Sequence, residues 1–88
     1  PHKVIDVNLP TCTLDQLNEL FTACPDGVVR AKGFIPRAEG GSWLVHFAGG
    51  RLDALPSDHS PTPLTVIFIA ALLSADETKR WLTSRIDQ

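Results

Sequence analysis

The chain lacks the features that mark membrane proteins and nucleic-acid-binding arms. No apolar run approaches the ~20 residues that a membrane-spanning helix needs, and the longest, Leu64–Leu73, has about half that length. The formal net charge is −2, so bulk electrostatic attraction favours neither nucleic acids nor anionic lipids. We therefore expect no nucleic-acid partner and no membrane association.

Methionine is absent and the chain begins at Pro1, which leads us to expect a segment of a larger protein. Its 88 residues lie near the lower limit for a self-supporting hydrophobic core. A composition of 43% hydrophobic and 20% charged residues is ordinary for a globular chain. We expect a single domain over residues 1–88.

Cysteine is scarce, and its two copies are badly placed for a disulfide. Cys12 and Cys24 flank a predicted helix, whose rise of ~1.5 Å per residue would separate them by roughly 15–18 Å. A disulfide needs Cα atoms within about 7 Å. Two unpaired thiols favour a reducing, cytoplasmic location.

Apolar residues recur at three- and four-residue spacing in two segments, which predicts helices over Thr11–Cys24 and Ser74–Ile86. Each has a capping box at its start, as in Thr13 with Gln16. Strand patterns occupy Lys3–Asn8, Val28–Pro36, Ser42–Ala48, Arg51–Leu55 and Leu64–Ala70. The last of these is continuously apolar, which predicts a central strand buried on both faces.

The resulting order, β-α-β-β-β-β-α, predicts an α+β two-layer sandwich. We expect a mixed, mostly antiparallel sheet of four to five strands with both helices on one face, a variant of the ferredoxin-like arrangement. The opposite face of the sheet would then have no cover within this chain.

Catalytic motifs are absent from the sequence. It contains neither GxxxxGK[ST] nor GxGxxG, and its two Gly-Gly pairs fall in predicted hairpin turns, where glycine is expected. Ser57–Ser60 (SDHS) brings together the residue types of a hydrolase triad, but within one proline-bounded loop. A triad needs residues held by separate rigid elements, so we expect no catalytic residue here.

Metal ligands are also poorly arranged. His46 and His59 are weak candidates, because the chain has no CxxC, HxH or HxxxH spacing that would pre-arrange two ligands. The sequence predicts no metal site built wholly from this chain. An accessory metal-binding module that uses His46 or His59 is the alternative function.

The strand at Val28–Pro36 has two contrasting faces, because side chains two residues apart point the same way. One face carries Arg30, Lys32 and Phe34. The other carries small and apolar residues suited to packing beneath a helix, with a glycine that allows close approach: Val29, Ala31, Gly33 and Ile35. The cations are therefore expected on the uncovered face.

The next strand adds apolar residues to that face in either orientation. Trp43, Val45 and Phe47 share one of its sides, and Leu44 and His46 share the other. A face that mixes apolar groups with cations is typical of a contact with another domain or protein. Cations that only keep the open face hydrated are the competing interpretation.

The segment RAKGF at residues 30–34 resembles the hallmark of the C-terminal domain of CobW-type GTPases. The surrounding order is similar as well: a leading strand, the helix TLDQLNELF, then RAKGF, Trp43, GGRL at residues 49–52 and a late VIFI strand. The resemblance covers nearly the whole chain. The family's late strand typically ends VFIG, whereas this one reads IFIA at residues 67–70.

The resemblance implies a role in a larger GTP-dependent metallochaperone, in cobalamin synthesis, metal insertion or metal homeostasis. GTP, Mg²⁺ and a transition metal such as Zn²⁺ or Co²⁺ would then be bound by an N-terminal GTPase domain of the same polypeptide, and none of them by this chain. The present residues would form a non-catalytic domain that docks on that GTPase domain or on a client metalloprotein. Arg30, Lys32 and Phe34 are the expected docking residues.

Overall fold

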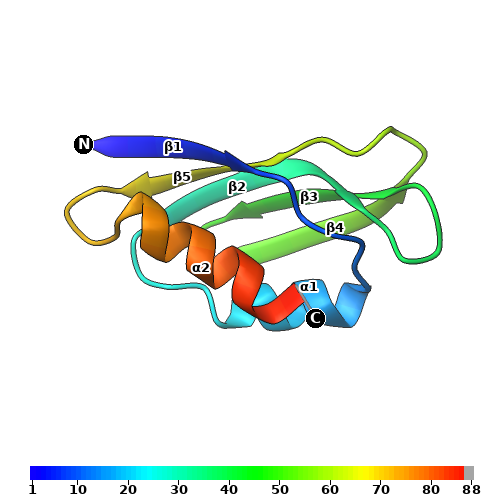
Figure 1. Ribbon diagram of the computed structural model, residues 1–88, viewed down its shortest axis with the longest axis horizontal. Coiled ribbons are helices and arrows are strands. Elements are labelled where there is room, and N and C mark those ends of the chain that lie inside the picture. The colour runs from blue at the N-terminus through cyan, green and yellow to red at the C-terminus, as the bar shows by residue number, and fades with distance from the viewer. Residues whose placement is uncertain (87–88) are drawn as a thin grey trace.

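The computed structural model describes residues 1–86, which form five strands and two helices (Figure 1). The strands are β1 (His2–Val7), β2 (Val28–Pro36), β3 (Ser42–Ala48), β4 (Arg51–Ser57) and β5 (Leu64–Ile69). The helices are α1 (Leu14–Thr22) and α2 (Ala75–Ile86). All seven predicted elements are present, and those at β2 and β3 have the predicted bounds.

The strands form one sheet in the order β1-β5-β2-β3-β4. Every pair of neighbouring strands is antiparallel. The predicted α+β sandwich is confirmed, but its sheet is antiparallel throughout rather than mixed. The reason is that α1 joins β1 and β2, which run in the same direction, and β5 lies between them.

Capping residues explain why both helices begin later in the chain than predicted. The Thr13 hydroxyl accepts a hydrogen bond from the Gln16 amide at 3.2 Å, and the Gln16 side chain accepts one from the Thr13 amide at 2.8 Å. Ser74 and Glu77 make the same reciprocal pair at 3.0 Å. Because an N-cap residue has non-helical backbone angles, each helix begins one residue after its cap.

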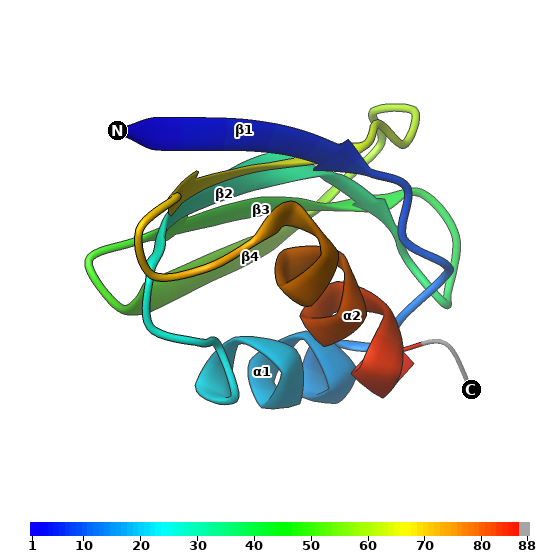
Figure 2. The ribbon, with the colours of Figure 1, turned by 60° about the vertical axis from the view of Figure 1, so that its left-hand side comes forward.

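Both helices pack on one side of the sheet (Figure 2). Phe21 of α1 contacts Phe47 of β3, with ring centroids 4.8 Å apart, and meets Trp81 of α2 edge-on at 5.4 Å. The Trp81 indole N–H also donates to the Leu20 carbonyl at 2.9 Å. The core therefore lies between the sheet and the two helices, and it holds the helices to each other as well.

A second group of contacts ties the segment before α1 to the end of the sheet. The Trp43 indole N–H donates to the Cys12 carbonyl at 3.1 Å, and the Arg37 guanidinium lies 4.7 Å from the centre of the Trp43 ring. The Cys12 amide donates to the Pro36 carbonyl. These contacts fix where the chain turns from β1 into α1.

Two expectations about individual strands were wrong. β5 alternates instead of being buried on both faces: Val66 is fully buried, whereas its neighbour Thr65 is exposed. In β2, the register shifts between Val28 and Arg30, so a β-bulge sends Val29 to solvent and Val28 packs against the core. The simple alternation of side chains fails at that bulge.

The role expected for Gly33 needs correction as well. Unlike the other five glycines, Gly33 has no positive φ, so space rather than backbone conformation explains it. A Cβ at position 33 would lie 2.5 Å from the Pro63 carbonyl oxygen and 3.1 Å from the Leu64 Cα. The close approach is to the backbone that enters β5, not to a helix.

Replacing Gly33 tests this crowding. Gly33→Ala should lower the free energy of unfolding by about 1–3 kcal/mol, because the new methyl group must displace backbone. Val29→Ala, at the exposed bulge of the same strand, should change it by about 0.5 kcal/mol or less. Urea unfolding of both variants measures the difference, and a Gly33→Ala variant as stable as the parent would refute the proposed contact.

Candidate docking face

The side of the sheet opposite the helices, here called the open face, has no covering layer in the described part of the chain (Figure 2). The strand registers determine which side chains it presents. They include His2, Val4, Asp6, Arg30, Lys32, Phe34, Leu44, His46, Ala48, Arg51, Asp53, Leu55, Thr65, Ile67 and Ile69.

Arg30 and Lys32 lie on β2, the middle strand, and both side chains are exposed as predicted. Arg30 stands between Ile67 of β5 and Ala48 of β3. Lys32 stands between Thr65 and His46 in the same way. The two cations, Thr65 and Ile67 line a shallow hollow of about 290 Å³.

Acidic residues stand on the two outer strands, and each already has a partner. Asp6 of β1 accepts a hydrogen bond from the Thr65 hydroxyl at 2.6 Å. Asp53 of β4 forms an ion pair with Arg51 at 3.4 Å. Within residues 1–86, neither Arg30 nor Lys32 forms an ion pair. The middle of the open face therefore carries positive charge without compensation.

Exposed apolar side chains also stand on both outer strands of the open face. Val4 on β1 is 59% exposed and Leu55 on β4 is 63% exposed. Leu44, Ala48 and Ile67 are half-buried between them. The orientation of β3, which the sequence left open, is now settled: its aromatic residues point to the core and Leu44 to the open face.

Phe34 is on the open face, as predicted, but it is not free. The His59 ring stacks on it, with centroids 4.1 Å apart and an interplanar angle of 15°. The loop that carries His59 is anchored to the strands beneath it: the Phe34 amide donates to the Thr62 hydroxyl at 3.0 Å, and the Ser42 hydroxyl donates to the His59 carbonyl at 2.8 Å. A partner would meet His59 at this position before it met Phe34.

The residue types of Ser57–Ser60 do not assemble into a hydrolytic site. The Ser57 hydroxyl accepts from the backbone amide of His59 at 3.0 Å, and His59 Nδ1 lies 2.6 Å from the Ser60 carbonyl oxygen. The imidazole thus meets a carbonyl group and an aromatic ring rather than a serine hydroxyl. No serine is activated in this arrangement.

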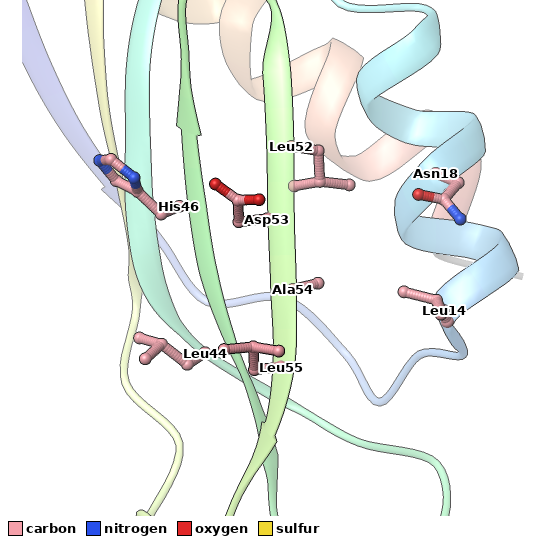
Figure 3. A pocket seen from close by; sticks show the side chains of 8 residues that line it. All are labelled: Leu14, Asn18, Leu44, His46, Leu52, Asp53, Ala54 and Leu55. Carbon is pink, nitrogen blue, oxygen red and sulfur yellow. The ribbon is translucent and has the colours of Figure 1, made fainter.

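His46 faces Asp53 across the β3–β4 pair, and its Nε2 is buried without a hydrogen-bond partner. Figure 3 shows both side chains on one side of β4, with Leu52 and Ala54 on the other side, toward α1. The hollow of about 520 Å³ that these residues line therefore opens around the free edge of β4 and is not one enclosed cavity. Across residues 1–86, no three His, Cys, Asp or Glu side chains come together as metal ligands would.

Both cysteine thiols are free. Burial raises the pKa of the Cys12 thiol to about 11. Burial, together with the nearby Asp26 carboxylate, raises the pKa of Cys24 to about 11. Because a thiolate is the reactive form, neither cysteine is suited to act as a nucleophile at neutral pH.

The chain matches a known protein family over most of its length. The family model described as "Cobalamin synthesis protein cobW C-terminal domain" matches residues 9–85. No curated protein and no solved structure matches the chain. None of the described helices is both long enough and apolar enough to cross a membrane.

The raised thiol pKa values predict a specific dependence of stability on pH. An unfolded cysteine has a pKa of about 8.5, so the folded state retains thiol protons that the unfolded state has already lost. The stabilisation is complete below about pH 8.5 and disappears as the pH rises toward 11. Urea unfolding at pH 8 and pH 10.5 should show this loss, and a Cys12→Ala/Cys24→Ala variant should show a smaller one. Equal losses in the two proteins would contradict the assignment.

Proposed function

The chain belongs to the family of cobalamin synthesis protein cobW C-terminal domains, and from that membership we propose a non-catalytic interaction domain of a GTP-dependent metallochaperone. In this proposal GTP, Mg²⁺ and the transferred Zn²⁺ or Co²⁺ are bound by an N-terminal GTPase domain of the same polypeptide. The present domain docks through its open face on that GTPase domain or on a client metalloprotein.

One observation carries the proposal: α1 and α2 lie on the same side of the sheet, and the open face combines exposed apolar residues with two cations that form no ion pair within residues 1–86. Exposed Val4 and Leu55 on the two outer strands are not explained if the open face contacts only solvent. Apolar groups beside cations are what a protein contact uses for area and for orientation, respectively. A catalytic function that uses the cysteines or the Ser57–Ser60 loop has less support from the structure.

The docking residues have different roles in this proposal. Arg30 and Lys32 supply charge at the centre of the contact. Phe34 acts indirectly, because it holds the ring of His59 and with it the loop that borders the face. We therefore expect the substitution of Phe34 to act through the position of the loop.

Charge reversal in the full-length protein tests the docking role. Arg30→Glu/Lys32→Glu should weaken nucleotide-dependent association of the open face with its partner at least about tenfold, since two favourable charges become repulsive. Lys79→Glu/Arg80→Glu is the matched control: it makes the same change of net charge at two exposed positions of α2. Association is measured by titration calorimetry, together with the rate of GTP turnover. If reversal on the open face changes neither quantity, the docking role is wrong.

The proposal that GTP hydrolysis takes place in an N-terminal GTPase domain can be tested separately. A protein made of residues 1–88 should show no GTP turnover above buffer, because the described residues contain no phosphate-binding loop. Circular dichroism first establishes that this protein is folded. Measurable turnover that persists after repurification would place catalysis in this chain and overturn the proposal.

A further inference from the structure

The structure also indicates what kind of surface the open face recognises, an inference that rests on the proposed docking function. We infer that its partner is a protein surface that presents one or two carboxylates bordered by apolar side chains. The observation behind this inference is the small size of the uncompensated positive area and the nature of its borders.

The positive area is narrow across the strands. Strands are spaced by about 4.8 Å, so Asp6 on β1 and Asp53 on β4 each lie about 10 Å from Lys32, on opposite sides. Across the strands at Lys32, a ligand with negative charge along its whole length would approach one of these acids as soon as it extended beyond β5 or β3. Across the strands at Arg30, it would reach Val4 on one side and Arg51, which is already paired with Asp53, on the other. Extended polyanions such as nucleic acids are thus disfavoured in this direction.

The area is also short along β2. Arg30 and Lys32 are two residues apart, which corresponds to about 7 Å at the rise of a strand. Beyond Lys32, the next open-face position of β2 is Phe34 with the His59 ring on it. The space suits one or two carboxylates, and the net charge of −2 adds repulsion toward longer polyanions.

The neighbours of Arg30 favour a carboxylate that is desolvated on docking. Ile67 and Ala48 flank it directly, and neither side chain can satisfy the guanidinium. An exposed ion pair contributes little on its own, but one enclosed by apolar groups at an interface is strengthened. Val4 lies farther out on β1, in register with Arg30 through Ile67, and can enclose the pair if the partner supplies apolar side chains opposite it.

The two acids of the open face, Asp6 and Asp53, help to orient the partner. The Thr65 hydroxyl is bonded to Asp6, and Asp53 is paired with Arg51. A partner carboxylate placed over either acid would be repelled, whereas one placed over β2 would be attracted. This difference fixes the position of the partner across the sheet.

The experiment is a charge exchange in the full-length protein. A photo-reactive benzoylphenylalanine at Val4, an exposed position that leaves both cations intact, is cross-linked during nucleotide-dependent association, and mass spectrometry locates the contacted segment. Carboxylates in that segment are then replaced by lysine. This change alone should weaken association at least about tenfold, and Arg30→Glu/Lys32→Glu in the same complex should restore it to within about threefold of the parent.

The outcomes separate this inference from the docking role. Two results would overturn the inference and leave the docking role intact. In the first, Arg30→Glu/Lys32→Glu abolishes association but the charge exchange does not restore it. In the second, the cross-linked segment of the partner contains no carboxylates. Inorganic polyphosphate and a single-stranded DNA 20-mer serve as competitors at physiological salt. We expect that neither competitor displaces the partner. Displacement by either one at micromolar concentration would contradict the inference and show that the open face binds a polyanion.

Discussion

The packing of Phe21 between Phe47 of the sheet and Trp81 of α2 is the contact on which the rest of this architecture depends. It draws both helices to one side of a five-stranded sheet and joins them to each other, with the Trp81 indole bonded to the Leu20 carbonyl. A small chain cannot bury both faces of such a sheet with two helices. The open face is therefore exposed because the core lies on the other side of the sheet.

The crossing from β4 to β5 completes that surface. Because β4 is at one edge and β5 lies between β1 and β2, the connecting loop must pass the ends of β3 and β2. Hydrogen bonds to Ser42 and Phe34 hold this loop in place, and the absence of a side chain at Gly33 leaves room for its backbone. The same loop carries His59 onto Phe34, so a constraint of chain connectivity decides that the Phe34 ring is covered by an imidazole.

Part of the candidate site follows from strand geometry alone. The exposure of Arg30 and Lys32 was predicted from their two-residue spacing and is confirmed. The stacking of His59 on Phe34, the bond from Thr65 to Asp6 and the bulge at Val29 were not predicted. Each depends on pairing between residues distant in sequence or on a register irregularity, and neither leaves a periodic signal in the chain.

The sequence by itself determined the seven elements, the capping residues that begin the helices and the α+β class, because hydrophobic period and capping are local properties. It also carried the residues by which the family is identified. Only the tertiary structure decided that β5 enters between β1 and β2, that Leu44 faces outward and that Asp6 and Asp53 flank the cations. These features depend on strand order and register, which are set by contacts across the whole chain.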